Sequence, residues 1–172
     1  MTDSFKHTVP TIGAGQATFE QCWLASYKMM LKSMKRSENE VEDKLRGAGI
    51  DVDDAKENGL LDTLYKKAAD ALELKAFAGS PFNDKPGFFD IGLSDGAEAF
   101  IAELEKGPLW VSRFVKTGSY HALVAIGYND SESRIIYNNP FPGPTNAVEL
   151  EFNANLFVKF ITNARGSVQG KK

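Results

Sequence analysis

The hydrophobic pattern of this chain changes once, after Gly107-Pro108. Before that pair, apolar residues recur every three or four positions, the period of a helix with one buried face. After it, short apolar stretches separated by turn residues predict β-strands. Helices followed by an antiparallel sheet indicate the α+β class, with a helical part over about residues 1–106 and a sheet part over about 107–165.

Four helices are expected in the first part, after an extended lead over residues 1–21. They are placed from Cys22 to about Met34, from a capping box of Ser37 and Glu40 to Gly47, over 59–73 with Leu61, Leu64, Ala68 and Leu72 on the buried face, and over about 95–106. The segment 78–92 contains too many prolines and glycines for a helix interior.

Four strands are expected in the second part, with a turn near residue 130. They are placed over 109–115, 120–128, 134–138 and 147–152. Residues 153–162 fit a short helix or a last strand, and the tail 166–172 reads as frayed.

Length and composition favour one soluble domain over residues 1–172. A hydrophobic content of 42% is enough for a core at this length. The net charge is −3 and no basic block is present, so nucleic acid is not expected as a partner. No apolar run could span a bilayer, and residues 1–15 lack a secretory pattern, so neither a membrane partner nor a cleaved signal peptide is expected.

The only cysteine is Cys22, and the only histidines are His7 and His121. A disulfide within the chain is impossible, and most zinc sites lack the ligands they need, so no metal or other cofactor is expected. A lone cysteine is often a small buried apolar residue. Its alternative role is that of a nucleophile, which requires a base nearby.

Cys22 stands at the predicted start of a helix. Free N–H groups and the helix dipole favour negative charge there, so the position is expected to lower the thiol pKa. His121, at the start of an apolar strand, is the candidate base, although it could equally be a half-buried strand histidine. His7 lies in a polar lead segment and is expected to be solvated.

A third group should orient the imidazole. Simple antiparallel pairing around a turn near 130 would place Asn139 opposite His121, with Asn138 as the alternative because side chains alternate between faces. Gln16, six positions before Cys22, could donate to an oxyanion together with the Cys22 N–H, and Gln21 is a weaker candidate.

Two stretches of the sequence resemble papain-like cysteine proteases. Residues 16–26, Gln-Ala-Thr-Phe-Glu-Gln-Cys-Trp-Leu-Ala-Ser, are similar to the papain-type nucleophile segment, and Tyr120 to Tyr128 are similar to the histidine strand. The order Cys, His, Asn is also the papain order. The resemblance implies a papain-like fold with Cys22 as nucleophile, His121 as base and acid, Asn139 as orienting group and Gln16 as oxyanion donor.

Within that clan the chain looks closest to compact effector or toxin proteases of plant-pathogenic bacteria and to bacteriocin-processing peptidases. Asn139-Pro140 after the histidine strand and Gly107 to Val111 before it carry this likeness. The papain Asn-Ser-Trp run and the Gly-Ser-Cys-Gly-Ser lead are absent, and residues 40–95 match no known pattern. The resemblance implies a protein substrate, delivery into another cell by a secretion system, and a cognate immunity or inhibitor protein as a further partner.

Alternatives to a protease remain at this stage. The same residues could serve an amidase, a glutamine deamidase or a transglutaminase, since fold does not settle reaction. A binding module with an inert, buried Cys22 is the non-enzyme alternative. Trp23 and Phe141 are candidates for substrate binding, and Phe82, Phe88 and Phe89 could line a cleft or pack in the core.

Overall fold

The computed structural model describes residues 3–11, 15–79, 82, 92–116, 119–141 and 146–172. Within them the helices are α1 (Cys22–Ser33), α2 (Glu40–Gly47), α3 (Val52–Asn58), α4 (Tyr65–Ala71), α5 (Asp95–Glu105) and α6 (Ala154–Lys159), with short 3₁₀ turns η1 (Phe19–Gln21) and η2 (Asp62–Leu64). The strands are β1 (Phe5–Lys6), β2 (Leu74–Ala78), β3 (Leu109–Lys116), β4 (Ser119–Asn129), β5 (Arg134–Asn139), β6 (Val148–Asn153) and β7 (Arg165–Lys171). The expected α+β architecture is present.

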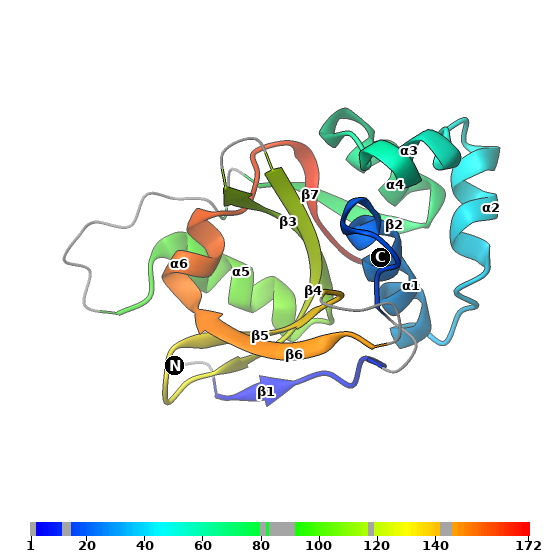
Figure 1. Cartoon of the computed structure of the whole chain (residues 1–172). Helices are drawn as coiled ribbons and strands as arrows, with labels where there is room; N and C mark the ends of the chain where they lie inside the picture. The colour runs from blue at the N-terminus through cyan, green and yellow to red at the C-terminus, as the bar shows by residue number, and fades with distance from the viewer. Residues whose placement is uncertain (1–2, 12–14, 80–81, 83–91, 117–118, 142–145) are drawn as a thin grey trace.

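The strands form one antiparallel sheet in the order β2-β7-β3-β4-β5-β6, and β1 pairs with β4 (Figure 1). Side chains that alternate along β4 enter two separate cores. Ala122 and Val124 pack in the core that contains α1, whereas Leu123 and Ala125 pack in the core that contains α5 and α6. The sheet is therefore covered on both faces, and β4 contributes to both cores.

Helix α1 is fixed to the sheet through aromatic packing and one buried amide. Tyr27 of α1 stacks on Trp110 of β3 with ring centroids 4.9 Å apart. The side-chain nitrogen of Gln169, on β7, lies 2.9 Å from the Tyr27 hydroxyl. Both tyrosine and glutamine are fully buried, so α1, whose first residue is Cys22, has a defined position over β3 and β7.

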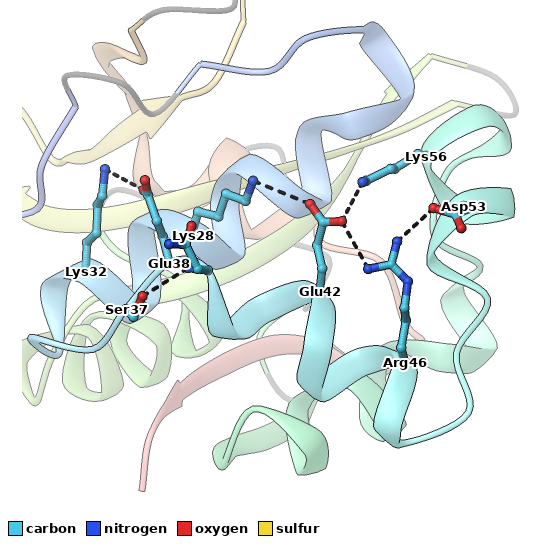
Figure 2. A network of polar contacts seen from close by, with 9 residues as sticks. Lys28, Lys32, Ser37, Glu38, Glu42, Arg46, Asp53 and Lys56 are labelled. Atoms are coloured by element: carbon cyan, nitrogen blue, oxygen red, sulfur yellow. Dashed lines mark hydrogen bonds and ion pairs between the residues drawn. The ribbon is translucent and has the colours of Figure 1, made fainter.

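The outer side of α1 is joined to its neighbours by ion pairs around Glu42 of α2. The Glu42 carboxylate lies 3.6 Å from Lys28 of α1 and 3.4 Å from Arg46, and it accepts a hydrogen bond from Lys56 of α3. Figure 2 shows these side chains converging, with Arg46 also bonded to Asp53 at 2.8 Å. One carboxylate thus connects three helices.

The predicted helix over 59–73 is wrong in its first half. Helix α4 begins only at Tyr65, and Leu61, expected on the buried face, is 62% exposed. A separate helix, α3, lies just before it and was not predicted. The Asp51 side chain caps α3 by accepting from the Asp54 N–H, and Gly59, at φ 86°, ends it. Seven residues with two buried side chains are too few to show a helical period.

The C-terminal tail is not frayed, because it forms β7 between β2 and β3. Gly166, Ser167, Val168, Gln169 and Gly170 are buried. The sequence pattern does not predict this strand because its residues are mostly small or polar, and only Val168 is a typical apolar residue of a strand interior. The buried hydroxyl of Ser167 bonds to Thr162 at 2.5 Å, which offsets the cost of its desolvation.

The remaining predicted elements are confirmed within a residue or two. Helices α1, α2 and α5 and strands β3 to β6 lie where the sequence placed them, and 153–162 contains a helix, α6. The capping box is only half formed: Glu40 accepts from the Ser37 N–H at 3.3 Å, but the Ser37 hydroxyl accepts from Asn39. None of the helices in the described residues has both the length and the apolar character needed to cross a membrane.

Candidate active site

Cys22 begins α1 directly after η1, and its side chain is turned toward β4. Its Sγ accepts a hydrogen bond of 3.4 Å from the backbone N–H of Ala122, the residue after His121. The side chain is buried, with 6% of the residue exposed. The start of α1 and the first residues of β4, the strand that contains His121, therefore meet at the sulfur.

The His121 imidazole is held by Asn139 across the end of the sheet. His121 Nε2 lies 2.6 Å from Asn139 Oδ1, and the backbone N–H of Phe141 donates to the same oxygen at 3.1 Å. An amide oxygen can only accept, so Nε2 carries the hydrogen. Nδ1 of the neutral ring is then free of a proton, and it is buried with no hydrogen-bond partner among the described residues.

Asn139, and not Asn138, contacts the imidazole. The predicted register is wrong by two positions, because β4 pairs Val124 with Asn138, whereas pairing around a turn at residue 130 would place Val124 opposite Ile136. Continuing that register places Asn139 beside Leu123, one diagonal step from His121 on the same face, which side chains can bridge. Asn138 points to the other core, where its Nδ2 reaches the carbonyl of Val9 at 3.5 Å.

Burial shifts the pKa values of the thiol and the imidazole in opposite directions. It raises the pKa of Cys22, and the N–H groups of Ala122, Trp23 and Cys22, which act the other way, do not outweigh it. The predicted lowering of the Cys22 pKa is therefore wrong for this resting arrangement. Burial lowers the pKa of His121 below 6.5, although the bond to Asn139 opposes that shift. No direct hydrogen bond joins Sγ to His121 within the described residues, and the two pKa shifts favour a neutral thiol and a neutral ring.

The Gln16 side chain is buried near the site but is engaged elsewhere. Its Nε2 donates to the carbonyls of Thr18 at 2.9 Å and Phe19 at 3.2 Å, and its Oε1 has no partner among the described residues. Its backbone N–H donates to the Pro140 carbonyl at 3.1 Å, which ties the lead segment to the end of β5. Both amide hydrogens are thus committed in this conformation.

Two cavities flank the Cys22–His121 region. A cavity of about 420 Å³ contains Cys22, Trp23 and Ala122 in its wall, and a second, of about 320 Å³, contains His121 and Asn139. Trp23 is only 2% exposed, and its indole N–H bonds to the Ala55 carbonyl.

The phenylalanines considered for a cleft have different positions. Phe141 is 49% exposed and borders neither cavity, and Phe82 is buried in the α5 core. Phe88 and Phe89 lie outside the described residues. Phe19, which was not predicted, borders the larger cavity and stacks near His121 with centroids 6.2 Å apart.

His7 is remote from this arrangement. It is not simply solvated, as expected, because its Nε2 lies 2.6 Å from the Leu104 carbonyl. In the part of the chain that the structure describes, no group of three or more His, Cys, Asp and Glu side chains could hold a metal ion.

Comparison with known proteins gives one match. A family model described as papain-like cysteine protease AvrRpt2 matches residues 4–157, a stretch that includes Cys22, His121 and Asn139. No curated protein and no solved structure matches the chain.

Proposed function

The chain belongs to the papain-like cysteine protease family of AvrRpt2, and on that premise we propose that it cleaves peptide bonds of target proteins with Cys22 as the nucleophile and His121 as the base. One observation supports this most strongly. The bond of 2.6 Å from His121 to Asn139 leaves Nδ1 as the ring's proton acceptor, at the residue adjacent to the sulfur's N–H donor.

The first step is a proton transfer from Sγ to Nδ1. Burial disfavours an isolated thiolate and an isolated imidazolium, as the pKa shifts of Cys22 and His121 indicate. Transfer within the pair creates both charges together, and their attraction at close range offsets part of the desolvation cost. Asn139 keeps the Nε2 hydrogen in place and stabilises the charged ring through its oxygen.

The thiolate then attacks the scissile carbonyl and forms a tetrahedral oxyanion. The imidazolium Nδ1–H donates its proton to the leaving amine, and the neutral ring then activates water to hydrolyse the thioester. The backbone N–H of Cys22 is one proposed oxyanion donor. Gln16 is the second, which requires its amide to release the Thr18 or Phe19 carbonyl when substrate binds.

The test is to incubate the protein and its Cys22→Ala variant with a cell extract and identify new N-termini by mass spectrometry. Backbone cuts by the unaltered chain and none by Cys22→Ala are expected. Conversion of glutamine side chains to glutamate, or cross-links to amines, without any cuts would instead identify the deamidase or transglutaminase alternative. Cuts that persist in Cys22→Ala would exclude Cys22 as the nucleophile.

The biological setting that we propose is that of a bacterial effector or toxin delivered into another cell, with host or competitor proteins as substrates. Expression of the chain inside a candidate target cell should then reduce growth, and Cys22→Ala should remove that effect. If the target cell is another bacterium, co-expression of the neighbouring open reading frame should restore growth, which would identify the proposed immunity protein.

A further inference from the structure

The larger cavity beside Cys22 has an acidic and aromatic wall. Glu20, two residues before Cys22, and Asp62, in η2, both border it. Neither carboxylate forms an ion pair with another described residue, and no lysine or arginine lines the cavity among those residues. The other acidic side chains near α1, such as Glu42, are by contrast paired with several cations.

Aromatic rings complete this wall. Trp23, Tyr65 and Tyr120 border the same cavity, and of the three only Tyr120, at 40%, has a substantial exposed fraction. The hydroxyl of Tyr65 is bonded to Ser112 at 3.0 Å, which holds that ring in place. A cation over an aromatic face is attracted by the ring quadrupole, and a carboxylate adds charge-assisted hydrogen bonds. The exposed ring of Tyr120 and the two carboxylates together suit the long apolar stem and charged end of lysine or arginine.

The direction of a bound peptide follows from the proposed chemistry. The leaving amine must lie near His121 to receive its proton, and His121 borders the smaller cavity. The acyl part of the substrate, N-terminal to the scissile bond, then extends on the other side of Cys22, toward the larger cavity. We infer that this cavity, with Glu20 and Asp62, selects substrates that carry a lysine or arginine on the N-terminal side of the cleaved bond, an inference that rests on the proposed protease function.

The first test uses a peptide library in which each position before the cleaved bond is varied. The unaltered chain should cleave peptides with Lys or Arg at one of these positions at least about fivefold faster than the matching Met peptides, the scale of one close charge pair. In a Glu20→Gln, Asp62→Asn double variant, the ratio of the Lys or Arg peptide rate to the Met peptide rate should fall toward one. A control pair, Asp43→Asn with Glu105→Gln, removes two exposed carboxylates away from the cavity and should retain the preference.

The second test does not depend on proteolysis. The single cysteine can be modified with a cationic reagent, 2-aminoethyl methanethiosulfonate, and an anionic one, 2-sulfonatoethyl methanethiosulfonate, which both form a mixed disulfide and release methanesulfinate. The rate with the cationic reagent is divided by the rate with the anionic reagent, and this ratio is then divided by the same ratio for free cysteine. The result should be about five for the unaltered chain and should fall toward one in Glu20→Gln, Asp62→Asn. Burial is the main cause of the raised Cys22 pKa and the negative charge of Glu20 adds to it, but a change in thiolate fraction affects both reagents equally and cancels in the ratio.

The two tests separate the possible failures. Cleavage without any preference for cations, or a preference that survives in the double variant, overturns the inference and leaves the protease function intact. A cationic reagent preference in a chain that cuts no peptide overturns the protease function, and the peptide specificity with it.

Discussion

At the scale of single residues, one hydrogen bond decides which nitrogen of His121 can act as a base. Asn139 Oδ1 accepts from Nε2 and also from the Phe141 N–H, so the amide cannot rotate without losing two donors. Asn138 has no comparable constraint, because its own Oδ1 is buried without a partner among the described residues. The neighbouring asparagines therefore carry different expected roles.

Replacing Asn139 should damage catalysis more than binding. Asn139→Ala removes the acceptor that orients the ring, and kcat should fall by about 10²-fold with a much smaller change in KM, because orientation acts on proton transfer. Asn139→Asp keeps an acceptor and should retain more activity. Steady-state kinetics on a cleaved peptide measure both, with Asn138→Ala as the control. Equal kcat losses for Asn138→Ala and Asn139→Ala would contradict the assignment.

The pH dependence of cleavage follows from the direction of the His121 shift. Only the neutral ring can accept the Cys22 proton, and burial lowers the His121 pKa below its ordinary 6.5. The acidic limb of the kcat/KM profile should therefore have its midpoint below pH 6.5. The bond to Asn139 raises the His121 pKa, so in Asn139→Ala the midpoint should move lower still. A midpoint above 6.5, or an upward move in Asn139→Ala, would show that the imidazole is not the titrating base.

At the scale of elements, the sheet depends on a strand that the sequence pattern does not reveal. β7 pairs with both β2 and β3, and its Gln169 side chain approaches the Tyr27 hydroxyl of α1. The last residues of the chain thus help to position the helix that begins with Cys22. Their role is visible only when the sheet is assembled, because long-range pairing and not local propensity selects them.

Val168 tests this role of β7. It is fully buried against the α5 core, so Val168→Ala should reduce the free energy of unfolding by about 2 kcal/mol through lost burial and a small cavity. Lys171→Ala, at an exposed position of the same strand, should change it by less than about 0.5 kcal/mol. Urea denaturation gives both values. Indistinguishable stabilities for the two variants would support a frayed tail instead.

Glu42 tests the connection between helices. Its pKa is raised by burial but lowered on balance by the hydrogen bond from Lys56 and the charges of Lys56, Lys28 and Arg46. A lowered folded-state pKa means that the carboxylate adds stability above its ordinary value of 4.5, and that this stability is lost as pH falls below it. Glu42→Gln should therefore cost about 1–2 kcal/mol at pH 7 and much less near pH 3.

The control for this measurement is Glu57→Gln, an exposed carboxylate on α3 without an ion pair among the described residues. At both pH values, the free energy of unfolding of Glu57→Gln should be close to that of the unaltered chain. A loss in Glu42→Gln that is as large at pH 3 as at pH 7 would mean that packing, and not charge, connects the helices at this point.

At the scale of the whole molecule, the sequence predicts the elements with a clear period and misses those without one. Helix α1 and strand β4 can be predicted from the sequence because burial sets the spacing of their apolar residues. In α1 these are Trp23, Tyr27 and Met30, and in β4 they form a continuous run. The α3 helix and β7 are short or rich in small and polar residues, and tertiary contacts decide their structure. The pairing of His121 with Asn139 was anticipated from an incorrect register, since Asn129 pairs with Arg134 and the turn is therefore centred beyond residue 130.

In the candidate active site, too, some features follow from the sequence pattern and others depend on tertiary contacts. Motif order indicates Cys22, His121 and Asn139, but the engagement of Gln16 by the Thr18 and Phe19 carbonyls depends on the local path of the chain. The net pKa shift of Cys22 also depends on burial, which a helix-start argument does not include. Residue type and position along a helix indicate which chemistry is available, whereas packing sets the charge state from which it begins.

The most direct measurement is the mass of the Cys22-containing peptide after a cleavage reaction is quenched in acid. The account predicts a transient thioester that joins the N-terminal product of the substrate to Cys22, and no such adduct in His121→Ala. Substrate cleavage without any acyl adduct on Cys22, at times when single-turnover kinetics require one to accumulate, would contradict it.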